Sequence, residues 1–355
     1  MNTMQHCYTI LNKTISIHSD NPLLIKEFHK DYHLFKQSAD DKMSIDIQIQ
    51  LHDNLLQINQ HCMDLSTHPT PIHFAFQVVV SEIMSQLNDY YLIHAGVVKK
   101  NDHAIVLAGP PGIGKSTLVK KLVSHGFVFY SDDCAPLHKQ SGMIYPFPRA
   151  LWLVDKKDNA NTIRSKKAVP IACSTDKPNP VAPTTMICLL DENADDNNIQ
   201  LNLSLKSSDN PLIHKLKNMP DIVCKRRHPE HAEYRIEYAA SENITKSIHD
   251  TCNRHKDYLW TIYRVPPIRK CFDRQANIKK VTAHQVAAEI LSDMKMFESC
   301  LTPSLNEAPM ASLMNISRHL QNTNCYFMSV GKLSTEIELI LRALKNDLNQ
   351  SNECG

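Results

Sequence analysis

Glycine is scarce in this chain of 355 residues. It occurs 8 times, whereas an average usage of about 7% would give about 25. Five of the eight glycines lie between residues 96 and 126. Glycine is needed where the backbone adopts a positive φ or approaches a ligand closely. The scarcity elsewhere therefore marks residues 96–126 as a segment with special backbone requirements.

Long apolar runs are also missing. The longest, such as Phe127–Tyr130, fall far short of the roughly 18 residues that span a bilayer. The first ten residues have neither a basic start nor an apolar stretch, so they do not resemble a signal peptide. The 11 cysteines are dispersed and contain no C-x-x-C pair, which favours reduced thiols over a disulfide framework. We therefore expect a cytoplasmic protein that does not cross a membrane.

Net charge of one sign is absent as well. Lys and Arg total 39 against 37 Asp and Glu, a formal charge of +2. Such a balance gives no electrostatic reason to expect nucleic acid as a partner. Hydrophobic residues make up 42% of the chain, enough for a folded core. At about 150 residues per domain, the length suggests two or three domains.

The glycine-rich segment contains a phosphate-binding motif. Residues 109–116 fit G-x-x-x-x-G-K-[ST] in full. An apolar run, Ile105–Leu107, precedes the motif, and apolar residues at helical spacing follow it as far as Gly126. The order of strand, glycine loop and helix is the one that the motif requires. The candidate nucleotide-binding residues are Gly109, Pro110, Pro111, Gly112, Ile113, Gly114, Lys115, Ser116 and Thr117.

This order of elements predicts the chemistry of the segment. Backbone N–H groups of the loop and the first helical turn converge on an anion, helped by the positive end of the helix dipole. Lys115 can reach the β- and γ-phosphates, Ser116 can bind Mg²⁺, and Thr117 can support the α-phosphate. The alternative is a chance match on an ordinary loop, which the flanking strand and helix disfavour. The sequence therefore predicts ATP and Mg²⁺ as cofactors, although the motif itself does not distinguish ATP from GTP.

Two adjacent carboxylates follow the next apolar strand. Asp132 and Asp133 come directly after Phe127–Ser131, and Asp132 lies 17 residues beyond Lys115. In a βαβ unit both strands end at the same edge of the sheet, where α/β proteins bind ligands. There the pair could hold Mg²⁺ and accept a proton from an attacking hydroxyl. The alternative is that they only begin a turn or cap a helix. We favour the functional interpretation, without assigning the two roles.

A histidine lies upstream of the loop. His94 is 15 residues before Gly109, within the apolar pattern Tyr90–Val98. A tight turn at residues 99–102 would pair segments 91–98 and 104–109 as a hairpin. By itself a histidine in an apolar run is more often a core residue than a catalytic one.

Together these segments resemble the catalytic core of HPr kinase/phosphorylase and its relatives. They read His94-Ala-Gly-Val-Val98, then the nine loop residues, then Tyr130-Ser-Asp-Asp133, and the spacings also match. The chain is most similar to divergent HPr-kinase-related proteins encoded beside peptide-modification systems, some of which are peptide serine kinases. Tyr145-Pro-Phe-Pro-Arg149 is similar to the proline-rich segment of those relatives. The likeness is strong over about residues 88–155 and weaker at the N-terminus and over about 280–345.

The resemblance implies roles for the matching residues. It places Lys115 on phosphate, Ser116 on Mg²⁺, and Asp132 and Asp133 in the roles of general base and metal ligand. It places His94 near the transferred phosphate or its metal. Arg149 is a weaker candidate, and the resemblance also favours a homo-oligomer. HPr kinases carry a Glu…Arg-Gly-x-Gly signature that is missing here, because no glycine follows Gly142 until Gly331. HPr itself is therefore not the expected substrate.

The predicted fold class is α/β. We expect a P-loop core of the HPr kinase/phosphoenolpyruvate carboxykinase type at residues 86–205, a small N-terminal α/β lobe at 1–85, and a C-terminal accessory region at 206–355 that is mixed and then helical. Residues 156–183 are predicted to be a loop or lid.

Other charged groups have simpler explanations. Basic clusters at Lys225–His228 and Arg264–Lys270 are short and are predicted to be solvated faces. The acidic run Asp191–Asp196 is predicted to be a solvated turn. His228 and His231 fit no standard zinc spacing.

The sequence as a whole predicts an ATP- and Mg²⁺-dependent kinase. It would transfer the γ-phosphate to a hydroxyl, with Ser or Thr of a peptide or protein as the expected acceptor. Two alternatives stay open. One is a small-molecule kinase of the shikimate-kinase type, whose acids usually read Asp-x-Asp. The other is a non-catalytic module whose partner binding depends on nucleotide.

Overall fold

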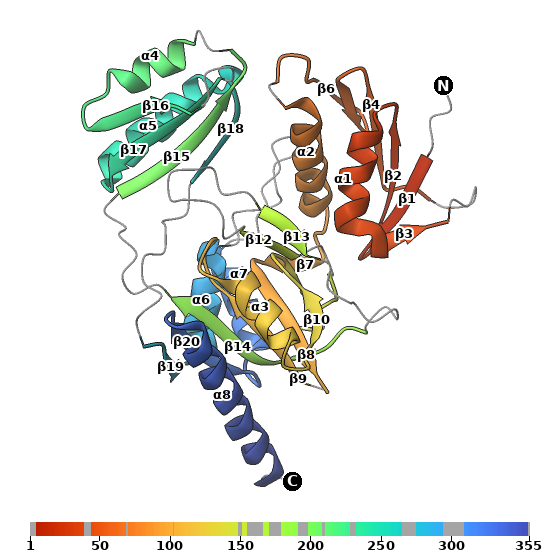
Figure 1. The fold of residues 1–355 in the computed structure, drawn as a ribbon, viewed down its shortest axis with the longest axis vertical. Helices are drawn as coiled ribbons and strands as arrows, with labels where there is room; N and C mark the ends of the chain where they lie inside the picture. The colour runs from red at the N-terminus through yellow and green to blue at the C-terminus, as the bar shows by residue number, and fades with distance from the viewer. Residues whose placement is uncertain are drawn as a thin grey trace.

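The structure, a computed structural model, shows an α/β protein with several sheets (Figure 1). It describes residues 5–38, 44–68, 70–101, 103–147, 151–154, 166–169, 179–190, 198–207, 210–227, 232–264, 275–293 and 309–353. Within these residues, no helix is long and apolar enough to cross a membrane. The predictions for Arg149, Asp191–Asp196, His228 and His231, most of 156–183 and residues 265–270 fall outside them.

The N-terminal segment forms a six-stranded sheet with two helices. The strand order is β3-β1-β2-β4-β5-β6, and β2 and β4 are parallel whereas the other pairs are antiparallel. Asn21 caps the first helix by accepting a hydrogen bond from the Leu23 N–H at 3.0 Å, as a short polar side chain does at a helix start. The elements are β1 (Gln5–Ile10), β2 (Lys13–Ser19), α1 (Pro22–Tyr32), β3 (Lys36–Gln37), β4 (Ile47–His52), β5 (Leu55–Ile58), β6 (His61–Asp64) and α2 (Pro71–Ser85).

The central sheet has the order β10-β8-β9-β14-β20-β19. Its strands β9, β14 and β20 are mutually parallel, whereas β8 is antiparallel to both β9 and β10. Strand β10 is therefore parallel to β9, with β8 between them. The sheet elements are β8 (Ala95–Lys100), β9 (His103–Ala108), β10 (Val128–Ser131), β14 (Pro183–Leu190), β19 (Asn277–Lys280) and β20 (Asn324–Ser329).

Helices cover both faces of this sheet. The alternation along β9 places Ile105 and Leu107 in the core formed with α3 and α8, and Ala104 and Val106 in the core formed with α6 and α7. A strand buried on both faces is apolar throughout, which is why the run before the glycine loop was recognisable in the sequence. The helices are α3 (Lys115–Val123), α6 (Ala283–Asp293), α7 (Pro309–His319) and α8 (Leu333–Glu353). Two smaller pairs accompany them, β7 (Tyr90–Ile93) with β11 (Ala135–His138) and β12 (Leu151–Val154) with β13 (Lys166–Val169).

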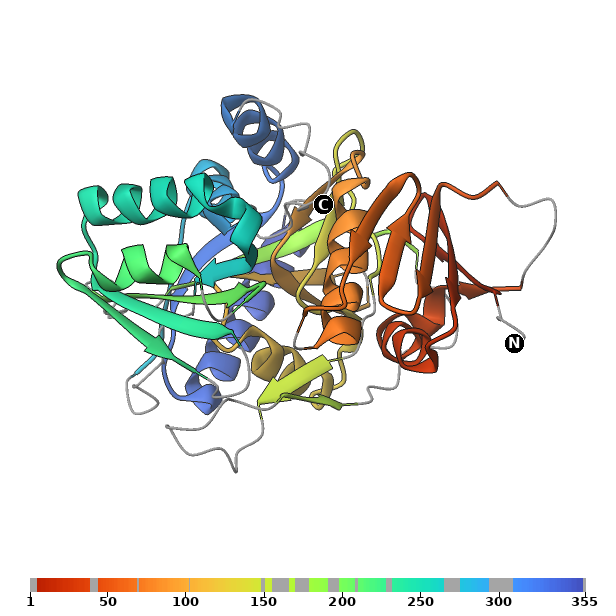
Figure 2. The ribbon, with the colours of Figure 1, turned by 90° about the horizontal axis from the view of Figure 1, so that it is seen from above.

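A third sheet lies between β14 and β19 in the chain. Its order is β16-β17-β15-β18, it is antiparallel, and α4 and α5 pack on one of its faces with a core of their own (Figure 2). We call residues 198–264 the inserted module. Its elements are β15 (Asn198–Leu205), α4 (Pro211–Lys217), β16 (Ile222–Arg226), β17 (Glu233–Ala239), α5 (Glu242–Arg254) and β18 (Leu259–Arg264).

This topology differs from the predicted boundary at residue 205. Strand β15 pairs with β17 and β18, so it belongs to the inserted module and not to the central sheet. Strands β19 and β20 pair in the central sheet, although both lie in the region 206–355 that was expected to be a separate accessory part. The physical reason is that sheet pairing joins segments far apart in sequence, which local composition does not reveal.

The basic cluster that begins at Lys225 is partly neutralised. Lys225 lies 3.3 Å from Glu237, and Arg227 lies 3.7 Å from Glu233, across the β16–β17 pairing. These ion pairs agree with the prediction of a solvated face rather than a site for an acidic ligand.

Candidate active site

The glycine loop connects β9 to α3 and contains three residues with positive φ. These are Gly109 (141°), Gly112 (81°) and Gly114 (112°). A Cβ on Gly109 would lie 2.7 Å from the carbonyl oxygen of Leu189, so no larger residue fits there without movement of the backbone. Helix α3 begins at Lys115, and the first N–H groups of a helix have no partner within it. The sequence therefore folds into a loop and helix N-terminus suited to bind an anion.

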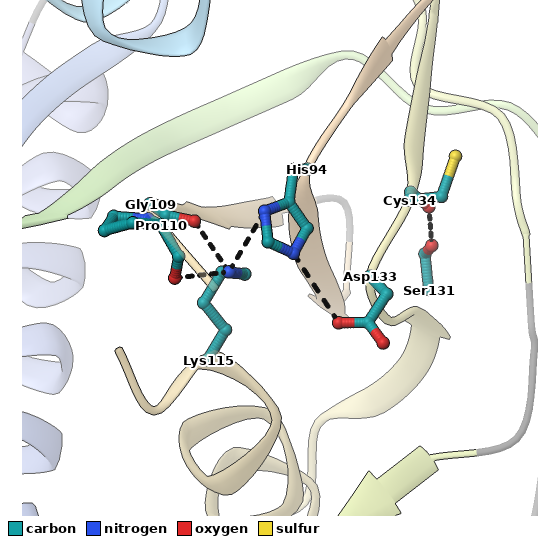
Figure 3. Close-up of polar contacts among 7 residues, drawn as sticks. All are labelled: His94, Gly109, Pro110, Lys115, Ser131, Asp133 and Cys134. Carbon is teal, nitrogen blue, oxygen red and sulfur yellow. Dashed lines mark hydrogen bonds and ion pairs between the residues drawn. The ribbon is translucent and has the colours of Figure 1, made fainter. Parts of the chain in front are cut away.

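Lys115 is held against the loop that it follows. Its side chain is 4% exposed. The ammonium Nζ donates to the carbonyl oxygens of Gly109 at 2.6 Å and Pro110 at 3.0 Å, and it lies 3.5 Å from Nδ1 of His94 (Figure 3). A buried ammonium needs such acceptors, because burial without them is costly. The cation is thus fixed at the place where loop, helix and His94 meet.

His94 reaches the loop because of the hairpin. It lies between β7 and β8, and Ala95 pairs with Ala108 at the end of β9. The predicted hairpin is therefore confirmed in part, because 95–100 pairs with 103–108, whereas residues 91–93 of the predicted first strand pair with β11 instead. The ring is 5% exposed, and its Nε2 lies 3.8 Å from Oδ1 of Asp133. Lys115 can only donate, so a hydrogen bond across this contact requires Nδ1 to accept, which leaves Nε2 to carry the ring proton toward Asp133.

The two aspartates follow β10, whose end lies at the same sheet edge as the glycine loop. Asp132 is 1% exposed, whereas the side chain of Asp133 is 38% exposed. Asp133 has φ 61°, a left-handed conformation in which Asp is among the better tolerated non-glycine residues. One carboxylate thus points into the protein and its neighbour lies beside His94 at the surface.

Asp132 has an unusual electrostatic environment. Both carboxylate oxygens are buried, and neither makes a hydrogen bond of good geometry with the residues that the structure describes. Burial, followed by the charge of Asp133, raises the pKa of Asp132 to about 7, and Ser116 and Lys115 oppose this rise only in part. These groups compensate the buried carboxylate only in part, and a bound cation would complete the compensation.

The side-chain atoms available as metal ligands fit Mg²⁺ better than a transition metal. Ser116, Asp132 and Asp133 offer only oxygen atoms, which Mg²⁺ prefers. Among the described residues, no three His, Cys, Asp or Glu side chains group as a metal site. Mg²⁺ commonly takes one or two carboxylates and completes its shell with water and phosphate oxygens. Ser116 and the two aspartates could therefore hold it together with a nucleotide.

The structure also shows site residues that have no local sequence signal. Glu289 and Cys188 lie with His94 and Gly109 around a gap that is too small to hold a water molecule. Glu289 comes from α6, far along the chain, and only the order of strands in the central sheet brings it here. Gly96 of β8 is the second case, since a Cβ there would lie 2.4 Å from Val119 and 3.4 Å from Asp132. The scarcity of glycine elsewhere in the sequence points to residues 96–126, but it does not indicate that Gly96 lies against Val119 and Asp132.

Comparison with known proteins adds little. No family model matches the sequence, and no curated protein matches it. Among solved structures, the Hpr(Ser) kinase/phosphatase from Coxiella burnetii is similar at 16% identity, over 46% of this chain and 95% of that one, with a TM-score of 0.22. So low a TM-score carries no weight for fold or function. The helices and the parallel and antiparallel strand pairs by themselves define an α/β protein with mixed sheets.

Proposed function

We propose that this protein is an ATP- and Mg²⁺-dependent kinase. It transfers the γ-phosphate to a hydroxyl, with Ser or Thr of a peptide or protein as the acceptor. The supporting observation is the chain of contacts from the glycine loop through Lys115 and His94 to Asp133, beside the buried carboxylate of Asp132. A peptide or protein as the acceptor is supported by the resemblance of the His94, glycine-loop and aspartate segments to HPr kinase/phosphorylase and its relatives.

The loop and Lys115 would bind the phosphates. The three positive-φ glycines leave the loop N–H groups free of Cβ obstruction, and the start of α3 adds its dipole. In phosphoryl transfer, catalysis is mostly positioning and charge stabilisation. Lys115 would exchange its two carbonyl acceptors for phosphate oxygens, which are stronger acceptors because they are charged.

The different exposure of the aspartates suggests different roles. Asp132, buried beside Ser116, would hold Mg²⁺, which neutralises phosphate charge when bound. Asp133, which is partly exposed, would accept the proton of the acceptor hydroxyl while the hydroxyl oxygen forms a bond to the γ-phosphorus. The bond from that phosphorus to the β–γ bridging oxygen breaks, and ADP leaves. His94 would orient Asp133 through its Nε2 proton.

The first experiment is transfer from γ-labelled ATP with Mg²⁺ into size-fractionated extract of the source cells. Lys115→Ala should reduce labelling at least about 100-fold, by analogy with the loss of a group that stabilises developing charge. Lys120→Ala, an exposed lysine of the same helix, is the matched control and should label like wild type. Lys115-dependent label in a peptide or protein fraction supports the proposal. ATP binding without label in any fraction contradicts it, and label in a metabolite fraction contradicts the acceptor class.

A second experiment separates the two aspartates. Asp133→Asn should lose transfer and keep Mg²⁺-dependent ATP binding, because its carboxylate would act on the acceptor. Asp132→Asn should weaken the dependence of ATP binding on Mg²⁺. Titration of ATP at several Mg²⁺ concentrations distinguishes the variants, and unchanged transfer in both would remove the pair from the mechanism.

A further inference from the structure

A second cavity lies at the end of the central sheet away from the glycine loop. Its volume is about 490 Å³, within the roughly 300–1,000 Å³ of small-molecule sites. It is lined by the turn between β8 and β9, the segment after α3, and the middle of α8. His103, on its wall, begins β9, whose other end precedes the loop roughly 17 Å away at about 3.3 Å per residue. The cavity is thus separate from the candidate active site.

The floor of this cavity is apolar. Phe127 is 5% exposed, and Leu341 and Leu344 of α8 are half-buried beside it. The three come from elements that are distant in sequence but packed together in the core shared by α3 and α8. An apolar ligand group placed on this floor would remove more of their surface from water, which is favourable.

The rim carries positive charge. Lys100 and Lys345 both line the cavity and are exposed, and Lys100 places its Nζ 5.1 Å from the centre of the Phe127 ring. His125 also lines the rim. No acidic side chain lines the cavity among the described residues, which leave out Asp102. An ammonium held over the Phe127 ring of an apolar floor favours a ligand whose anionic group lies next to an apolar group.

We propose that this cavity binds a small amphipathic anion, an apolar group that carries a carboxylate or a phosphate. The apolar part lies on Phe127, Leu341 and Leu344, and the anionic group meets Lys100 and Lys345. A second copy of this chain is a poorer occupant, because pairing this surface with the same surface of another copy would bring the lysines of both copies together. His103 and Leu344 also line an adjoining cavity of about 350 Å³ with mixed polar and apolar walls, which extends the site for a longer ligand.

The test uses dodecanoate as the probe, below its micelle concentration, with the full chain and isothermal titration calorimetry. We expect saturable binding of one equivalent, at least tenfold weaker in the double variant Lys100→Glu/Lys345→Glu. Lys26→Glu/Lys215→Glu, two exposed lysines elsewhere, is the matched control and should bind like wild type. Leu344→Gln should also weaken binding, without a change of charge. Dodecyltrimethylammonium, which has the same chain length and the opposite charge, should not compete.

Each other outcome overturns the proposal. These are no saturable binding to wild type, equal binding to the double variant, or competition by the cationic amphiphile. If the double variant instead changes the oligomeric state without affecting dodecanoate, the surface is an interface between copies. Far-UV circular dichroism and thermal melting of the same samples show whether the variants stay folded, and neither measurement depends on the proposed nucleotide binding.

Discussion

The carboxylate of Asp132 is buried without good hydrogen-bond donors among the described residues, which opposes folding whenever it is ionised. Its pKa is raised to about 7 in the folded protein by burial and then by Asp133, from an ordinary value of 3.8. Below about pH 4 it is protonated in both the folded and the unfolded chain. Between the two pKa values only the unfolded chain ionises, so stability falls as pH rises and the loss is complete above about pH 7.

Asp132→Asn should therefore stabilise the metal-free, nucleotide-free protein at pH 8. The gain in unfolding free energy is at most about 4 kcal/mol, the full value of the pKa difference, and it should vanish near pH 4. Urea denaturation of both proteins at several pH values in a chelator measures it. Asp133→Asn, at a more exposed carboxylate, is the control and should gain less. A variant that is less stable than wild type at pH 8 would contradict this view of the buried carboxyl.

At the scale of single residues, the sequence indicates which side chains of the candidate site lie close together but not how each is oriented. The loop pattern and the spacings were enough to select His94, Lys115, Asp132 and Asp133. The division of the aspartates into a buried and an exposed carboxylate depends on the φ of 61° at Asp133. Sequence reasoning has no signal for that angle, because Asp occurs readily with either sign of φ near a turn.

The contact between β8 and α3 depends on the absence of a side chain. Gly96 faces Val119, and a Cβ would lie 2.4 Å from its Cγ2. Val is stiff at χ1 and cannot swing away cheaply. Gly96→Ala should therefore destabilise the protein by about 1–3 kcal/mol, the usual effect of overpacking. Strain displaced toward Asp132, 3.4 Å from that Cβ, should also weaken Mg²⁺-dependent ATP binding.

A double-mutant cycle tests the source of that strain. Val119→Ala removes the clashing methyl group at the cost of a small cavity, so the pair Gly96→Ala/Val119→Ala should lose less stability than the sum of the single variants. The control pair is Val97→Ala/Val119→Ala, which changes the next residue of β8 and creates no clash. Its losses of stability should be additive. Additive losses in the Gly96 cycle would mean that α3 moves freely away from β8.

Elements close in sequence were predicted better than those joined over long distances. The strand, loop, helix and strand from residue 103 to 131 follow the expected order, because each is marked by local periodicity and by glycine. The pairing of β14 with β20 joins Thr185 to Asn324, and nothing near either residue indicates its partner. The boundary predicted at residue 205 rests on local composition, which likewise does not indicate that β15 pairs with β17 and β18.

At the scale of the molecule, the cores are not independent of one another. The N-terminal sheet shares its core with Tyr90, Leu92 and Phe147, which lie beyond the predicted lobe at 1–85. Trp260 of β18 packs against the same core, with ring centres 5.3 Å from His68 and 5.1 Å from Phe74. The inserted module is thus joined to the N-terminal sheet by an aromatic contact.

That contact can be followed because the chain has only 2 tryptophans. In a Trp152→Phe background, the fluorescence of Trp260 reports on its own surroundings. Phe74→Ala should shift the emission maximum to longer wavelength, because loss of the Phe74 ring lets water reach Trp260. Phe74→Leu fills most of the same volume and should leave the emission near that of the background protein. Unchanged emission in Phe74→Ala would show that Trp260 is shielded by other groups and that the module does not depend on α2 for its position.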